Sequence, residues 1–353
     1  MQSFWMPKKE PLYAPMLSSF GGGSTRGFRG LGKAKAILYA LTSHTFTNAG
    51  ATGLTGPSLS QTQNAYSGAT FFTAGSYFSV PDTGLQRWTV AADGMWRIRA
   101  AGAQAQYAGE GAIMQADFDL LAGDELIMAV GQMGYEGSQQ GGDGAGGTFV
   151  TKVVSSGGDN LSTVSNTSVT PLVIAGGGGN QKCGSPGSQT YMKGNDGTSA
   201  TSTANSNTPP VGEGGLYHGT GVYAGGGYNS GGNANAMRSF LDNPYGTGAP
   251  CGQGSSNLGG SYGGGANFCA GGGGGYTGGS GGCTQNLSPD GNSASGGGSF
   301  IASVGTNVHT HTGSFTNSGT ASGHSAIATS TQYGTTNQNG NTGMGYVYVE
   351  YLG

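Results

Sequence analysis

The sequence predicts an all-β protein: a jelly-roll type of β-sandwich, interrupted by a long glycine-rich insertion and preceded by an extended N-terminal arm. Three observations carry this prediction. Glycine makes up 76 of the 353 residues and stands in runs. Short apolar segments separated by turn signals bracket those runs, as in sandwiches built from many short strands. Charged residues are only 8% of the chain, far below the roughly 25% of ordinary domains.

The glycine runs allow two opposite structures, and the rest of the composition decides between them. Glycine loses more backbone freedom on folding than any other residue, so runs suit either a disordered chain or backbones packed very closely. Disorder needs few apolar residues and a high net charge. This chain has 35% hydrophobic residues, 9% aromatic residues and a net charge of -3. We therefore expect a folded protein.

Residues 1–40 are expected to form an extended arm, because they contain several prolines and show no helical or strand period. They hold six bases and one acid, a balance of +5, whereas the remainder of the chain has a balance of -8. A basic arm on a weakly acidic body favours an acidic partner. One R-G-F-R-G stretch at 26–30 is too little for RGG-type RNA binding, so we expect a protein partner and no nucleic acid.

Residues 41–175 carry the first part of the predicted sandwich. Period-two alternation predicts strands at 87–90 and 95–99, and Asp93-Gly94 between them predicts a hairpin. Asp117 and Asp119 share one face of a further strand, where they could act as a carboxylate pair or simply lie on a solvated face. The other expected strands of this part are 45–47, 113–118, 125–130, 148–154 and 171–175.

The insertion, residues 176–298, cannot form ordinary strands, because so many glycines leave no side chains to pack. Collagen is excluded because no strict G-X-Y period exists. We expect polyglycine-II helices, which share the three residues per turn of polyproline II and must pair their backbone groups with neighbours. The glycines expected to pack in this way include Gly176, Gly177, Gly178, Gly271, Gly272 and Gly273.

The sandwich is expected to resume in residues 299–353, so that the whole domain spans residues 41–353. Strands are predicted at 299–304 and 346–352. The stretch between them, residues 305–343, is rich in Ser, Thr, Asn and Gly. It is expected to be a polar insertion, either a flexible loop or a separately packed segment.

Chemical motifs are sparse, and no enzyme or cofactor is predicted. The chain has no G-x-S-x-G elbow and no G-x-x-x-x-G-K-[ST] loop. His309 and His311 would face the same side of a strand, so three pairs in a trimer could bind one metal ion; two solvated histidines are the simpler interpretation. The four cysteines show no CxxC spacing, which argues against a zinc ribbon and leaves disulfides or free thiols open. Residues 1–11 show no secretory h-region.

An ordered series of motifs runs through the predicted sandwich: F-T-N-A-G-A-T-G-L-T-G-P at 46–57, Q-R-W-T-V at 86–90, V-G-Q at 130–132 and P-L-V-I-A-G at 171–176. This series resembles the glycine-rich domain in the extracellular regions of the anaplastic and leukocyte receptor tyrosine kinases, over about residues 44–304 and 343–352. The resemblance implies a TNF-like sandwich with polyglycine-II insertions. Where those domains carry a Cys pair, this chain has Ala49 and Thr62, which fits folding without oxidation.

The arm shows a second likeness, since L-Y-A-P-M-L at 12–17 and G-G-G-S-T-R-G-F at 21–28 resemble the N-terminal arms of structural proteins of tailed bacteriophages. Phage tail-fibre adhesins also contain polyglycine-II domains that carry host-recognition loops. Together the resemblances imply a virion protein whose arm binds other virion proteins. The anchoring residues would be Tyr13, Pro15, Arg26, Phe28 and Arg29.

The functional hypothesis is a tail or head fibre that recognises a host-surface protein or glycan. Loops rich in polar residues and tyrosine suit such contacts. Two alternatives stay open: a capsid, neck or tail decoration protein without receptor binding, and a secreted bacterial adhesin or filament subunit. TNF-like sandwiches often form trimers, which favours a homotrimer, although the receptor-type domains need not form one. The expected receptor contacts are Tyr217, His218, Tyr223, Tyr228, Phe240 and Tyr245.

Overall fold

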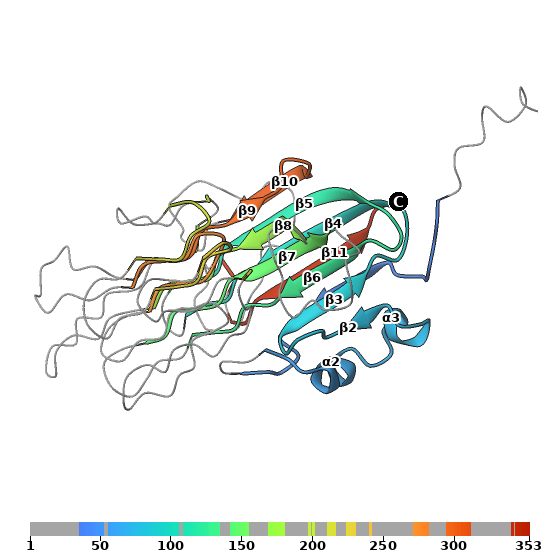
Figure 1. Ribbon diagram of the computed structural model, residues 1–353, viewed down its shortest axis with the longest axis horizontal. Helices are drawn as coiled ribbons and strands as arrows, with labels where there is room; N and C mark the ends of the chain where they lie inside the picture. Colours follow the sequence, from blue (N-terminus) through green and yellow to red (C-terminus); the bar gives the residue numbers. More distant parts are fainter. Residues whose placement is uncertain are drawn as a thin grey trace, which may run out of the picture. The chain divides into compact units, whose positions relative to one another are not determined.

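The computed structural model shows two antiparallel sheets packed face to face, with few helices (Figure 1). The all-β prediction is therefore confirmed. The chain divides into two units, residues 1–36 and 37–353, and the described helices and strands belong to the second. The structure describes residues 35–52, 56–105, 109–134, 142–154, 169–180, 197–198, 200–201, 210–216, 224–230, 240–241, 271–281, 294–311, 340–341 and 343–353.

The two sheets have five and six strands among the described residues. The first has the order β1 (Ser43–Phe46), β11 (Tyr346–Tyr351), β4 (Gly94–Ala101), β5 (Ile113–Leu120) and β10 (Thr306–His311). The second has the order β2 (Phe78–Ser79), β3 (Leu85–Thr89), β6 (Glu125–Ala129), β7 (Thr148–Val153), β8 (Val169–Ala175) and β9 (Phe300–Ile301).

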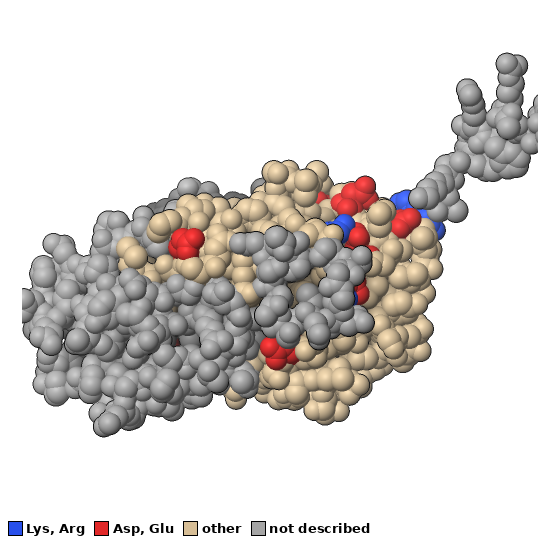
Figure 2. Space-filling view, in the orientation of Figure 1, with Lys and Arg blue, Asp and Glu red and all other residues tan. Residues whose placement is uncertain are grey.

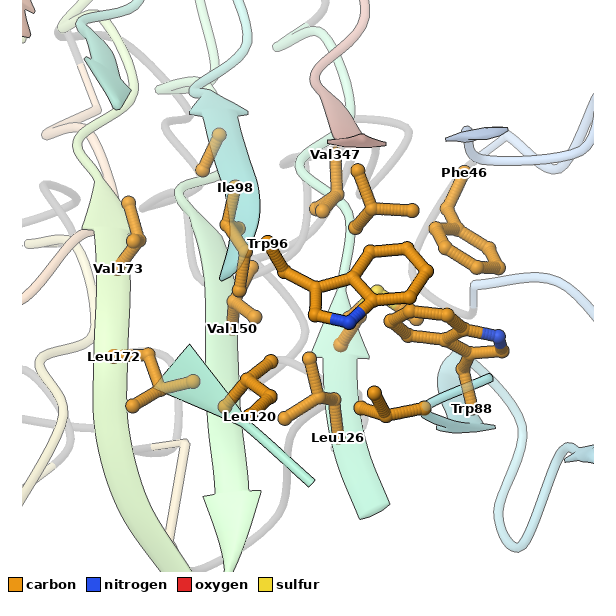
Figure 3. Packing of buried hydrophobic residues seen from close by; sticks show 14 of the residues in the cluster. Phe46, Trp88, Trp96, Ile98, Leu120, Leu126, Val150, Leu172, Val173 and Val347 are labelled. Carbon is orange, nitrogen blue, oxygen red and sulfur yellow. The ribbon is translucent and has the colours of Figure 1, made fainter. Parts of the chain in front are cut away.

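The core lies between the sheets, where alternate residues of each strand point inward. Trp88 of β3 and Trp96 of β4 meet edge to face, with ring centroids 5.3 Å apart. Both rings are fully buried, and Phe46 of β1 lies 5.8 Å from the Trp88 ring (Figure 3). Each indole N–H finds a partner, since Trp88 donates to the Tyr39 hydroxyl and Trp96 to the Ala92 carbonyl. These aromatic contacts join the first sheet to the second.

The predicted hairpin at Asp93-Gly94 is wrong. Strands β3 and β4 are present, but β3 pairs with β2 and β6 while β4 pairs with β5 and β11. The turn carries the chain from one sheet to the other instead of folding it back. This arrangement places Trp88 and Trp96 on opposite sheets, where their rings meet edge to face and are fully buried in the core.

Two short helices lie in the part of the chain, residues 41–175, for which only strands were predicted. Helix α2 (Leu59–Ala65) begins with a capping box in which Ser58 and Gln61 satisfy each other's backbone N–H groups. Helix α3 (Thr70–Thr73) brings the buried Phe71 against Phe46 and Phe78. The helices cover the side of the core next to β1 and β2.

Two predicted boundaries also differ from the structure. The folded body begins before residue 41, because Ile37 pairs with Ala92 and Tyr39 is buried in the core. Strand β10 lies inside the stretch 305–343 that was expected to be a loop insertion, and it pairs with β5. Its polar side chains conceal it in the sequence, since an edge strand with one open face needs few apolar residues.

Candidate functional site: the glycine platform

Glycine-rich segments continue from the strand ends on one side of the sheets, where Figure 1 draws them as coloured traces running side by side. We call this group of segments the glycine platform. Strand β4 passes into Gly102, and β8 passes into the run that begins at Gly176. The segments of the platform are 102–105, 109–112, 131–134, 142–147, 176–180, 213–216, 224–228, 271–281 and 294–299.

Backbone hydrogen bonds join these segments with a repeat of three residues. Gly177 N–H donates to the Gly274 carbonyl at 2.8 Å, and Asn180 N–H, three residues on, donates to Gly271 of the same segment at 3.0 Å. A β-ladder repeats every two residues, whereas polyproline-II geometry repeats every three. Four further pairs of N–H groups three residues apart donate to carbonyls three residues apart. The donors and acceptors are 109 to 179 and 112 to 176, 225 to 279 and 228 to 276, 271 to 142 and 274 to 145, and 295 to 280 and 298 to 277.

Successive residues of one segment bond to different neighbours. The N–H groups of Gly102, Ala103 and Gln104 donate to Ala112, Gly146 and Gly343, which belong to three separate segments. A strand can reach only one neighbour on each edge of its sheet. The backbone hydrogen bonds of the platform therefore run in more than one plane, whereas those of a β-sheet lie in the plane of the sheet.

Glycine is required in the platform because carbonyl oxygens occupy the space of side chains. A Cβ at Gly178 would lie 1.9 Å from the Gly109 oxygen, and a Cβ at Gly273 would lie 2.1 Å from the Gly177 oxygen. Contacts below 3.0 Å are essentially unknown for real Cβ atoms, and here the obstacle is backbone. Since the position of the absent Cβ points at a carbonyl oxygen, a Cα–H of the glycine faces that oxygen, as in weak Cα–H···O contacts.

All six glycines singled out from the sequence lie in this network. A Cβ at Gly176 or Gly177 would lie 2.1 or 2.4 Å from a carbonyl oxygen of another segment, and a Cβ at Gly272 would lie 2.0 Å from the Gly279 oxygen of its own segment. Gly271 donates its N–H to Gly142 at 2.9 Å. The two runs at 176–180 and 271–275 thus bond directly to each other.

A row of stacked rings fastens the platform to the second sheet. Phe149 of β7 stacks on Phe240 with centroids 5.0 Å apart, Phe240 stacks on Tyr228, Tyr228 on Tyr276, and Tyr276 on Phe300 of β9 at 4.6 Å. The row covers the face of the sheet that points away from the main core, together with Leu85, Ile127 and Ile174. The second sheet is therefore buried on both faces.

This second core contradicts the expected exposure of two residues. Tyr228 and Phe240 were expected to contact a receptor, but they are 4% and 0% exposed because the aromatic row encloses them. The sequence did hold a signal, since the unbroken apolar runs 126–130 and 172–175 lack the alternation of a strand with one wet face. The other expected contacts, Tyr217, His218, Tyr223 and Tyr245, lie outside the described residues, as do Tyr13, Pro15, Arg26, Phe28 and Arg29.

The outer face of the first sheet is polar but offers no acid–base pair. Arg97 Nε lies 2.9 Å from Asp117 Oδ1, and Asn307 donates to Asp117 Oδ2 at 2.8 Å. Burial raises the pKa of Asp117, but these bonds and the charge of Arg97 outweigh it, so its pKa lies below its usual value. Asp119 is exposed. The charged Asp117 serves as the partner of Arg97, and Figure 2 shows that most of the described surface on one side of the molecule is uncharged.

His309 and His311 lie on β10, opposite Gln115 and Ile113 of β5. Within the described residues no group of three or more His, Cys, Asp and Glu side chains could hold a metal ion. The four cysteines lie outside this part of the chain. In the same part, no helix is long and apolar enough to cross a membrane. No protein-family model matches the chain, and no curated protein matches it.

Proposed function

We propose that the chain is a structural protein of a bacteriophage virion, a tail or head fibre that uses the glycine platform to display recognition loops. In this proposal the sandwich is of the TNF-like jelly-roll type and the platform is a bundle of polyglycine-II helices. The arm, residues 1–36, binds another virion protein. The protein carries no enzymatic activity.

The observation that supports this proposal most strongly is the three-residue repeat of hydrogen bonds in the platform. Backbone pairs with backbone in several directions, so the ordering cost of glycine is offset by satisfied N–H and C=O groups. Such a bundle is stiff without a large apolar core. Stiffness is what a displayed recognition site needs, because loops already held in place lose less entropy on binding.

The far edge of the platform supports the assignment of recognition to the loops. Gly142, Asn180 and Gly271 are bonded together there, since Asn180 donates to Gly271 and Gly271 donates to Gly142. The stretches 135–141, 181–196 and 242–270 each begin or end at these residues. One end of each of these three stretches therefore lies at the same place on the platform, as is expected of loops carried by a scaffold.

A decoration protein without receptor binding is the second candidate, and the burial of Tyr228 and Phe240 favours it, because it removes two aromatic side chains from the expected contact surface. Exchanging residues 242–270 for a serine–glycine linker separates the two candidates. A fibre loses adsorption to host cells and keeps its place in the particle, whereas a decoration protein keeps both.

Electron cryomicroscopy of purified particles tests the proposal itself. The proposal expects density for the sandwich on the particle surface with the platform pointing outward, and loss of that density when residues 1–34 are deleted. Particles that lack the chain altogether refute a virion role. A truncated chain that still assembles refutes the role of the arm.

A further inference from the structure

Exposed aliphatic side chains gather at the end of the sandwich away from the glycine platform. Ile37 is 67% exposed, Leu121 59%, and Leu38 and Leu352 42% each. We call these four residues the end-face cluster. Exposed apolar side chains that stand singly are ordinary, whereas several on neighbouring segments at one end of a fold are a candidate surface for a partner.

The turn between β3 and β4 holds the cluster together. Ile37 pairs with Ala92 of this turn, and Leu38 N–H donates to the Ala91 carbonyl at 2.7 Å. Leu352 N–H donates to Met95 at 2.8 Å. On the third side, Ala122 N–H donates to Asp93 Oδ1 at 2.8 Å, which fixes the loop carrying Leu121. Three separate segments that carry exposed aliphatic residues thus have their backbones bonded to one turn and its flanks.

The cluster and the glycine platform lie at opposite ends of the same strands. Strand β4 starts at Gly94 beside the cluster and ends at Ala101, from which the platform continues (Figure 1). Two further exposed side chains, Val154 at 56% and Val304 at 73%, follow the ends of β7 and β9, which start from the platform. The sandwich thus carries the glycine platform at one end and exposed aliphatic side chains at the other.

We propose that the end-face cluster docks onto the same protein that binds the arm, an inference that rests on the proposed function. The arm runs through residue 36 directly into Ile37, so a partner that holds the arm is kept at high local concentration beside the cluster. The partner's surface has an apolar patch for the cluster next to an acidic groove for the basic arm. Attachment by two sites fixes the direction in which the platform points, which an extended arm alone cannot do.

Site-specific photo-crosslinking in the cells that produce the chain tests this proposal. The full chain carries a photoreactive residue at Tyr13 in the arm, at Leu121 in the cluster, or at Val211, which is 56% exposed but belongs to the platform side. We expect Tyr13 and Leu121 to crosslink to one and the same protein and Val211 not to reach it. We also expect Leu121→Lys to lower the Tyr13 crosslink at least tenfold, and Val211→Lys to leave it unchanged.

Each of the other outcomes refutes one stated part of the proposal. A crosslink from Tyr13 without one from Leu121, or a crosslink from Leu121 to a second copy of this chain, refutes docking through the cluster. A shared partner that is not a virion component leaves the docking intact and refutes the proposed virion function. Absence of both crosslinks refutes the arm and the cluster together. Matching thermal unfolding of the two lysine variants shows that the charge acts on binding and not on folding.

Discussion

Adding one methyl group at Gly273 tests whether glycine is in the platform for close packing. In Gly273→Ala the new Cβ would lie 2.1 Å from the Gly177 oxygen and 2.9 Å from the Gly297 nitrogen. Both atoms are backbone, so two segments must move apart by about 1 Å or more to reach ordinary contact distances. That movement strains three buried bonds, from Gly177 to Gly274, from Gly273 to Ser295 and from Gly297 to Gly177.

The expected cost follows from those bonds. A buried backbone group that loses its partner costs about 1–3 kcal/mol, and overpacking adds about 1–3 kcal/mol. The free energy of unfolding should fall by about 4 kcal/mol, a large share of the roughly 5–15 kcal/mol of a typical domain. Gly68→Ala is the control, because its φ of +89° also disfavours a side chain while the space around it is open. Strain alone should cost it about 1 kcal/mol.

Urea unfolding followed by tryptophan fluorescence and by amide hydrogen exchange measures both variants. Fluorescence reports the sandwich, since Trp88 and Trp96 lie in its core, and exchange reports the platform. Equal costs for Gly273→Ala and Gly68→Ala would refute the reasoning, because the obstacle at Gly273 would then not exist.

Three further changes have definite outcomes in the same unfolding measurements. Burial lowers the pKa of His44 to about 4, so only the unfolded chain gains a proton at this residue as the pH falls from about 6.5 to about 5. The free energy of unfolding should therefore drop by about 1 kcal/mol from about pH 7 to about pH 5, a value reduced because the ring is partly exposed. His44→Phe should abolish this drop. Phe240→Ala should cost about 3 kcal/mol. Tyr228→Phe should cost nothing or stabilise, because the buried Tyr228 hydroxyl has no hydrogen-bond partner among the described residues; equal losses would contradict the aromatic row. Asp117→Asn should cost about 3 kcal/mol and the exposed Asp119→Asn under about 0.5 kcal/mol, and similar values would contradict the ion pair.

Local pattern was enough to predict most of the strands, because every second residue of β4, β5 and β11 belongs to the main core. It failed at the pairing of β3 with β4, since Asp93-Gly94 specifies a turn and not which sheet each arm of the turn joins. The sheet that each strand joins depends on tertiary contacts such as that between Trp88 and Trp96 across the core, which local sequence pattern does not encode. Strand β10 was missed for a related reason, because it contributes few apolar residues to the core.

The sequence predicted that the glycine runs pack closely, but it did not predict which segments of the platform bond to each other. Glycine runs in a chain of low charge indicated close backbone packing, and the glycines from 176 to 178 and from 271 to 273 lie in such packing. Which segment bonds to which depends on carbonyl positions, and glycine has no side chain that could encode them. The aromatic row was missed because tyrosines between glycines were taken for surface residues, whereas the unbroken apolar runs of β6 and β8 required a cover on the outer face.

Residue-resolved amide hydrogen exchange of the full chain tests most directly whether the glycine runs form a bonded bundle. The account predicts that Gly177, Asn180, Gly271 and Gly274, whose N–H groups donate to other segments, exchange as slowly as the core amides of β4 and β5. Exchange of these four amides at the rate of an unstructured chain, while β4 and β5 stay protected, would contradict it.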